Sequence, residues 1–355
     1  MKTRGSQMGI AAVIVPERAL SVTEVDRAPV APGEVRIDVA YCGVCGSDLH
    51  LFFDPPDPLT GHVLGHEFSG VVSETAADVR GWTVGDRVAI RPIDECGDCT
   101  ACRSDDGVCL TGVVRGPGLG RPGGLAESVT VPSRMLHRIP DTVSLRDAAL
   151  TEPLAVAVRA VVRAEVAPGD GVVVFGAGPI GLLAVEVLRA RGITDVLVVE
   201  PHDARRALAS GSGVRTTTPD RVREEAAALF ADGPRAVLEC SGNPSCAQDA
   251  VDILGYQGRL VIVGISGVPS ELLLMQVAVS EITIVGSTAY SERDFGEALA
   301  HLAAGRIRVD ALVTSVVGLD GADAKLRELS GGTGSDIKVL VQPTDRGSRD
   351  PRNST

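Results

Sequence analysis

The sequence predicts an α/β protein in which an antiparallel β domain is joined to a doubly wound parallel sheet. Residues 10–139 consist of short runs with apolar side chains at every second position, interrupted by turn signals, as in antiparallel strands. From residue 171 onward, short apolar runs alternate with longer helical segments, as in parallel strands joined by helices. The change of pattern near residue 151 predicts a domain boundary.

Alternation in the first region is clearest at Val35, Ile37 and Val39, where every second residue is apolar and β-branched. Glycine-containing turn signals at residues 31–33 and 84–86 separate such runs. Short strands broken by tight turns indicate a barrel-like antiparallel domain.

The second region predicts strands and helices in alternation. We expect helices at residues 154–166, 180–191 and 295–304. We expect strands at residues 172–175, 196–199, 236–239, 259–263 and 282–285, with later strands at 311–317 and 337–341. The later strands are expected to rejoin the first domain, so the predicted domains are 1–152 with 291–355, and 153–290.

Composition narrows the class of function. The chain of 355 residues has a formal net charge of -12 and a pI near 5.0, which disfavours nucleic acid and anionic membranes as partners. The polar start lacks the apolar segment of a signal peptide, and glycines interrupt the apolar run at residues 171–188. Residues 1–8 and 344–355 are expected to be loose ends. We therefore expect a cytoplasmic protein that acts on small molecules.

Residues 41–70 are dense in groups that bind metals or move protons. Cys45 and His66 are the first candidates for a catalytic zinc, which takes three protein ligands and keeps a fourth position open. Taken alone, each has an ordinary alternative, because a single cysteine is usually a small buried hydrophobe and a single histidine a satisfied polar residue. Their neighbours favour the metal interpretation.

Four cysteines lie within fourteen residues further along the chain. They are Cys96, Cys99, Cys102 and Cys109, hereafter the four-cysteine cluster. Gaps of two residues let successive thiolates reach one tetrahedral centre, and four thiolates leave no position open for chemistry. The alternative is a redox pair or incidental cysteines. The cluster therefore predicts a structural zinc.

A glycine-rich turn follows the strand expected at residues 172–175. The cofactor residues expected there are Gly176, Gly178, Pro179, Ile180 and Gly181. Small residues allow the backbone to approach a pyrophosphate at a helix N-terminus, and Glu200 after the next strand is placed to accept from ribose hydroxyls. Glu200 would repel a 2′-phosphate and favour NAD over NADP, while the nearby Arg205 would soften that preference. The alternative is a turn that only packs helix against sheet.

Taken together and in order, these motifs resemble those of the zinc-dependent medium-chain dehydrogenases, which include alcohol and polyol dehydrogenases. The matching phrases are residues 45–50, 65–67, the four-cysteine cluster, 152–154, 176–181 and 338–340. The resemblance implies a GroES-like catalytic domain, a Rossmann domain that binds NAD, and two zinc ions per chain. The Glu-Pro-Leu phrase at 152–154 is similar to that of the sorbitol and 2,3-butanediol dehydrogenase branch.

The resemblance also implies roles for individual residues. Glu152 is expected to be the third ligand of the catalytic zinc, directly or through water, and Glu67 to replace it during turnover. The alternative for Glu152 is a carboxylate that only stabilises a helix start. Asp48 is expected to accept a hydrogen bond from a ring nitrogen of His66 and so to fix the tautomer of that ring.

The implied reaction is hydride transfer from a secondary alcohol to NAD, giving a ketone. Ser47 is expected to take the proton and to pass it, by way of the cofactor ribose, to His50 and water. Residues 123–128 and 289–290 depart from the sorbitol dehydrogenase pattern, so we expect a polyol, cyclitol or amino-cyclitol without naming one.

Two other functions remain open for the same scaffold. One is a redox epimerase or lyase that retains its NAD, and the other is a non-catalytic nucleotide-binding zinc protein. The resemblance also implies a homo-oligomer, either a dimer or a tetramer.

Overall fold

The structure is a computed structural model that describes residues 8–27, 29–54, 59–331 and 336–344. The chain divides into two compact units. Unit 1 consists of Met1–Glu152, Leu302–Ala304 and Val313–Thr355, and unit 2 of Pro153–His301 and Gly305–Leu312. The return to unit 1 comes later than the predicted residue 291, because most of helix α10 (Glu292–Ala303) groups with unit 2.

Unit 1 is built on a branched, mainly antiparallel sheet. Its strands are β3 (Glu34–Gly43), β4 (Glu67–Thr75), β5 (Arg87–Ile90), β6 (Ser128–Pro132), β7 (Leu136–Arg138), β14 (Val313–Val317) and β15 (Lys338–Val341). Neighbours follow the order β14, β15, β3, β4, β5, β7, and β6 also pairs with β3. A separate hairpin joins β1 (Met8–Val15) to β2 (Ala19–Asp26). The last strand in sequence, β15, therefore pairs with the C-terminal end of β3.

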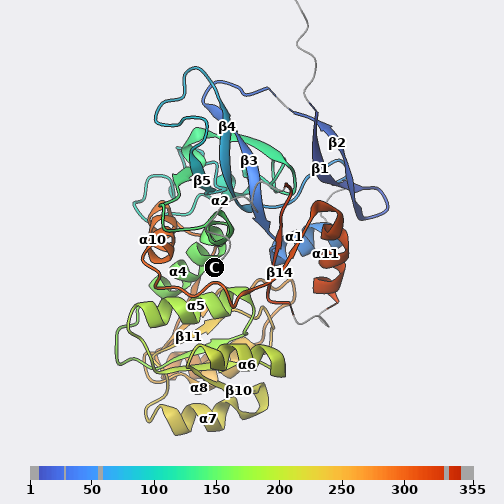
Figure 1. Cartoon of the computed structure of the whole chain (residues 1–355). Helices are drawn as coiled ribbons and strands as arrows, with labels where there is room; N and C mark the ends of the chain where they lie inside the picture. The colour runs from blue at the N-terminus through green and yellow to red at the C-terminus, as the bar shows by residue number, and fades with distance from the viewer. Residues whose placement is uncertain (1–7, 28, 55–58, 332–335, 345–355) are drawn as a thin grey trace, which may run out of the picture. The chain divides into compact units, whose positions relative to one another are not determined.

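Short helices connect the strands of unit 1. They are α1 (Gly46–Phe53), α2 (Leu110–Arg115), α3 (Leu145–Ala148), α11 (Ala322–Ser330) and the 3-10 turns Ser133–Met135 and Leu319–Gly321. Helix α11 contacts α1 and strand β2 of the hairpin, so segments far apart in the sequence lie side by side within unit 1 (Figure 1). One core, which includes Phe52, Phe68 and Leu326, contains side chains from both ends of the chain.

Unit 2 contains the predicted parallel sheet. Its strands are β8 (Val172–Phe175), β9 (Val196–Val199), β10 (Arg215–Thr217), β11 (Ala236–Glu239), β12 (Arg259–Ile262) and β13 (Thr283–Gly286). Neighbours follow the order β10, β9, β8, β11, β12, β13, which is the doubly wound order 3-2-1-4-5-6. This order reverses between β8 and β11, and ligands of such sheets bind where the order reverses.

Helix α4 (Thr151–Ala164) precedes the first parallel strand of unit 2. The strands are connected by helices α5 (Pro179–Ala190), α6 (Asp203–Gly211), α7 (Val222–Leu229), α8 (Cys246–Ile253), α9 (Leu274–Val279) and the 3-10 turn Pro219–Arg221. The sheet strands β8, β9 and β11 are buried along their whole length, which explains their continuous apolar runs. Valine and leucine side chains from these strands and from α7 and α8 form the core.

The structure corrects the expectation that residues 10–139 consist only of short strands and turns. Helices α1 and α2 lie within this range, and α1 begins where the Asp48 carboxylate accepts the backbone N–H of Cys45 at 2.9 Å. That bond satisfies a donor at the helix N-terminus, so a local cap outweighs the strand-like composition. Of the predicted loose ends, residues 1–7 and 345–355 lie outside the described residues. No helix among the residues the structure describes is long and apolar enough to cross a membrane.

Candidate active site and metal centres

Helix α1 and the residue that caps its N-terminus provide four of the predicted active-site residues. Cys45 precedes its first turn, and Ser47, Asp48 and His50 lie within it. The Asp48 side chain is 1% exposed and accepts from the backbone N–H groups of Cys45 and, at 3.4 Å, Gly65. It therefore ties the start of α1 to the residue before His66.

The ring of His66 lies between Asp48 and Ser47. Its Nδ1 is 3.6 Å from Asp48 Oδ1, and its Nε2 is 3.5 Å from Ser47 Oγ. Burial disfavours the charged ring, but the charges of Asp48 and Cys45 outweigh it and raise the pKa of His66 well above its usual value. Asp48 thus has the position expected of a group that orients a metal-binding histidine.

Three ligand atoms converge at the junction of β3, α1 and β4. They belong to Cys45, His66 and Glu67, hereafter the donor group, and all three atoms lie within 4.8 Å of one another. His66 and Glu67 are buried, and Cys45 is partly exposed, so the group can be reached from outside. A thiolate, an imidazole and a carboxylate are all zinc ligands, and their convergence fits the predicted catalytic zinc.

Glu152 is not a member of this donor group. Its side chain is 9% exposed at the start of α4, and its charge acts on Lys338. The third donor that converges with Cys45 and His66 is Glu67. The assignment of Glu152 as a ligand therefore stays a prediction.

Sequence reasoning missed one member of the site. Lys338, at the start of β15, forms a buried ion pair with Glu67 and is 2% exposed. Burial disfavours the charged amine, but Glu67 and Cys45 raise its pKa above the usual value. A signal existed, since Lys338 is one of only three lysines in the chain.

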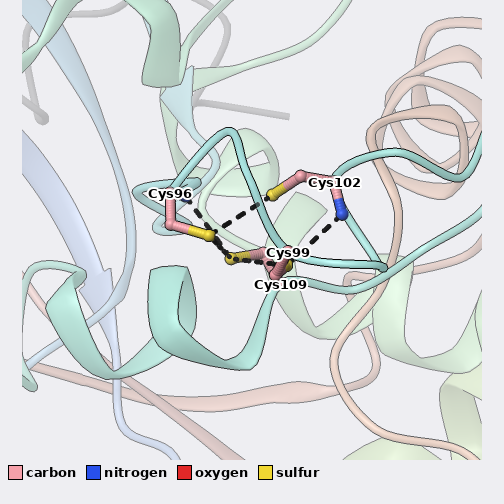
Figure 2. A group of neighbouring side chains, drawn as sticks. All are labelled: Cys96, Cys99, Cys102 and Cys109. Atoms are coloured by element: carbon pink, nitrogen blue, oxygen red, sulfur yellow. Dashed lines mark hydrogen bonds between the residues drawn. The ribbon is translucent and has the colours of Figure 1, made fainter.

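The four-cysteine cluster converges on a loop of unit 1 (Figure 2). The Sγ atoms of Cys96 and Cys109 are 3.6 Å apart, and the pairs Cys96–Cys102 and Cys99–Cys109 are each 3.9 Å apart. Tetrahedral zinc with Zn–S bonds of about 2.3 Å would place its sulfurs about 3.8 Å apart. Backbone N–H groups also point at the sulfurs, including Gly112 N–H at 3.2 Å from Cys109. The site thus has the dimensions of a closed, structural zinc centre.

The glycine-rich turn follows β8 as predicted from the sequence. Gly176 has φ +94°, which favours glycine, and a Cβ on Gly181 would lie 1.9 Å from the Gly176 carbonyl oxygen. Gly178 precedes α5, with Pro179 as its first residue. The backbone of this turn and the N-terminus of α5 are therefore accessible to a pyrophosphate group.

Glu200 follows β9 beside this turn. Its carboxylate is 3% exposed and accepts the backbone N–H groups of Ala177 at 2.8 Å and His202 at 3.0 Å. Each carboxylate oxygen can accept a second bond, so the group can still accept from ribose hydroxyls. Arg205 lines the same cavity of about 300 Å³, which also includes Gly176 and Gly178.

A second cavity, of about 560 Å³, opens at the carboxyl ends of β11, β12 and β13. Its lining includes Glu239, Gly242, Gly264 and Gly286, which follow or end these strands. Sequence reasoning did not identify it, although glycines directly after apolar strands were a usable signal. The two cavities together line the carboxyl edge of the sheet from β9 to β13, where a doubly wound fold binds an extended ligand.

Comparison with known families agrees with this geometry. The family described as "Alcohol dehydrogenase GroES-like domain" matches residues 31–141, and "Zinc-binding dehydrogenase" matches residues 179–304. These ranges cover the strands of unit 1 around the donor group and most of the parallel sheet of unit 2.

Similar proteins span almost the whole chain. A 2-dehydro-3-deoxy-L-galactonate 5-dehydrogenase of Pseudoalteromonas atlantica is 33% identical, covering 94% of this chain and 98% of the relative. The solved 2R,3R-butanediol dehydrogenase of Bacillus subtilis has a TM-score of 0.86 and 31% identity, covering 95% of this chain and 100% of that chain. An alcohol dehydrogenase from Escherichia coli CFT073, solved with NADH, has a TM-score of 0.86 and 27% identity over 95% and 100% of the two chains. The chain therefore belongs to the zinc-dependent medium-chain dehydrogenases, in the alcohol and polyol dehydrogenase family.

Proposed function

We propose that this dehydrogenase oxidises a secondary hydroxyl of a polyol, cyclitol or amino-cyclitol to a ketone, with NAD as the hydride acceptor. The convergence of the donor group within 4.8 Å carries the proposal, because it supplies a zinc site at the start of a helix that also bears Ser47. The names of two relatives support the substrate class, since a butanediol and a deoxygalactonate both have neighbouring oxygenated carbons.

Cys45 and His66 would hold the catalytic zinc with Glu152 as the third ligand, directly or through water, and Glu67 lies close enough to their ligand atoms to replace Glu152 during turnover. Zinc supplies Lewis acidity, which makes an alcohol hydroxyl easier to deprotonate. Asp48 orients the His66 ring from its Nδ1 side and leaves Nε2 on the side of Ser47. The four-cysteine cluster would hold a second zinc with no position for substrate.

The released proton would leave along helix α1. Ser47 Oγ lies beside His66, and His50 is three residues further along the helix, on the same face and exposed to solvent. Ser47 would accept the proton from the hydroxyl and His50 would hand it to water. This arrangement joins a half-buried reaction site to bulk solvent.

Replacing His50 tests this relay. His50→Ala is expected to lower kcat for alcohol oxidation about tenfold below pH 7, and less at higher pH where hydroxide can take the proton directly. The pH profile of kcat measures the effect, and added imidazole should restore part of the rate. His50→Gln, which keeps a polar side chain but exchanges no proton, should match His50→Ala. A pH profile identical to that of the unchanged enzyme would contradict the relay.

Replacing Glu200 tests the cofactor choice. Glu200→Ala is expected to lower the preference for NAD over NADP about 100-fold, because repulsion between like charges costs several kcal/mol. The ratio of kcat/KM values for the two cofactors measures it. Arg205→Ala is the matched variant and should shift the ratio in the opposite direction. An unchanged ratio in Glu200→Ala would show that Glu200 does not select the cofactor.

The substrate class is tested by NADH formation against diols, alditols, cyclitols, amino-cyclitols and simple alcohols, each with NAD and with NADP. Turnover confined to polyhydroxylated secondary alcohols is the expected result. Turnover only with primary alcohols would contradict the proposal. So would turnover that needs no added NAD and depends on a cofactor that copurifies, which identifies a redox epimerase or lyase.

We also propose that the enzyme is a cytoplasmic homo-oligomer. None of the eight cysteines, which all lie in the described part of the chain, forms a disulfide, as is usual in a reducing compartment. Among the described strands, β13 pairs only with β12, and apolar side chains near it on α9 are 68% to 74% exposed at Met275, Leu274 and Val279. An open strand edge beside exposed apolar residues favours pairing with a second copy. Sedimentation velocity would give a dimer or tetramer, and a monomer at micromolar concentration would contradict this.

A further inference from the structure

One carboxylate of the donor group already has a partner. Glu67 is 1% exposed, and its Oε2 forms an ion pair with the Lys338 ammonium. The same ammonium donates to the backbone carbonyl of Val44 at 2.9 Å. The Glu67 carboxylate of β4 and the Val44 carbonyl directly after β3 therefore hold one cation beside the proposed zinc position.

The ion pair crosses a strand at a glycine. Gly43, the last residue of β3, pairs with Glu67 of β4 on one side and with Leu340 of β15 on the other. A Cβ on Gly43 would lie 2.1 Å from Glu67 Oε2 and 3.0 Å from Lys338 Cε. Any larger residue would displace the pair, so the backbone is shaped to let the two side chains meet.

Glu67 thus has two possible counter-ions. Its carboxylate lies within 4.8 Å of the ligand atoms of Cys45 and His66, so a zinc held by these two residues is within its reach. A catalytic zinc must keep one position open for substrate. A buried carboxylate without a partner is strongly unfavourable, so Glu67 without Lys338 would take the metal as its counter-ion.

We propose that Lys338 is a positioning residue that restrains Glu67 beside the zinc position and so keeps one coordination position available to the substrate. The inference rests on the proposed zinc site at Cys45 and His66. It assigns Lys338 no contact with the substrate and no part in proton transfer.

Cobalt substitution tests the restraint without relying on activity. Zinc is exchanged for Co²⁺ in the full chain, and the visible spectrum of Cys45→Ser is subtracted to isolate the metal held by Cys45. Lys338→Met is expected to weaken the ligand-field bands, as happens when a carboxylate raises the coordination number. It is also expected to slow metal loss to a chelator about tenfold and to lower kcat about 10- to 100-fold.

Two further variants separate restraint from a purely structural role. Lys338→Arg keeps the cation and should retain the native spectrum. Lys338→Met combined with Glu67→Gln removes both charges, should fold, and should recover the native spectrum because a neutral amide competes weakly for the metal.

The outcomes also separate this inference from the proposed function. Absence of any Cys45-dependent cobalt absorption in the unchanged chain would overturn the zinc site itself. Cys45-dependent absorption that Lys338→Met leaves unaltered would overturn the restraint alone. Loss of the Cys45-bound metal from Lys338→Met would likewise overturn it, since Lys338 would then be holding the site together.

Discussion

Cys45→Ser is expected to lower kcat at least about 1,000-fold while the protein stays folded and binds NAD with unchanged affinity. Cys45 is a thiolate donor in a group whose other members are an imidazole and a carboxylate, and a serine hydroxyl is a poor zinc ligand. The cofactor residues Gly176 and Glu200 belong to unit 2, whereas Cys45 belongs to unit 1. Turnover, metal content and an NADH binding titration measure the three parts of the expectation.

Cys42 provides the matched control. It lies three residues earlier, is fully buried, and its thiol donates to the carbonyl of Gly43. Burial raises the pKa of its thiol well above the usual value, and its sulfur is not among the atoms that converge with those of Cys45 and His66. Cys42→Ala should keep zinc and turnover. Loss of folding in Cys45→Ser, with Cys42→Ala normal, would mean that Cys45 is structural.

Cys102→Ser is expected to open the loop that carries the four-cysteine cluster. Removing one of four thiolates should cost at least about 3 kcal/mol of local stability, a fraction of the roughly 10 to 16 kcal/mol with which structural zinc is bound in finger peptides. Trypsin cleavage after the exposed Arg103, between Cys102 and Cys109, should accelerate about 100-fold because it requires local opening. Peptide mapping over time gives the rate.

Thr100→Ala is the control for this loop, since Thr100 is an exposed neighbour within the cluster and bears no thiol. It should be cleaved at the native rate. Equal cleavage of Cys102→Ser and the unchanged protein would contradict a metal held by the cluster. Acceleration in both variants would point to general loosening of the loop.

Much of unit 2 could be predicted from local pattern. Strands β8, β9 and β11 have the expected bounds, because a fully buried parallel strand is a continuous apolar run that ends at a glycine or polar residue. The Gly176 turn was equally visible, since its positive φ and close approach to Gly181 restrict the residue types. These features depend on neighbours in sequence.

The parts of the site that depend on strand register could not be predicted from local pattern, and Glu67 was expected at the zinc only through the family resemblance. Glu67 lies near Cys45 and His66 because β4 pairs with β3 in the register that places Glu67 opposite Gly43. Lys338 lies near Glu67 because β15 pairs with the other edge of β3. Both pairings join segments distant in the chain, and no local pattern of charge or hydrophobicity specifies them. The eight-residue helix α1 was missed for a different reason, since one side-chain cap at Asp48 decides it.

Zinc content is the most direct test of the account. Elemental analysis of the purified chain should find two zinc ions per chain, one of which disappears in Cys45→Ser and the other in Cys102→Ser. Loss of the zinc in Cys45→Ser should abolish turnover. Loss of the zinc in Cys102→Ser should open the loop that carries the four-cysteine cluster. A single zinc that survives Cys45→Ser would contradict the catalytic site, and with it the proposed dehydrogenase mechanism.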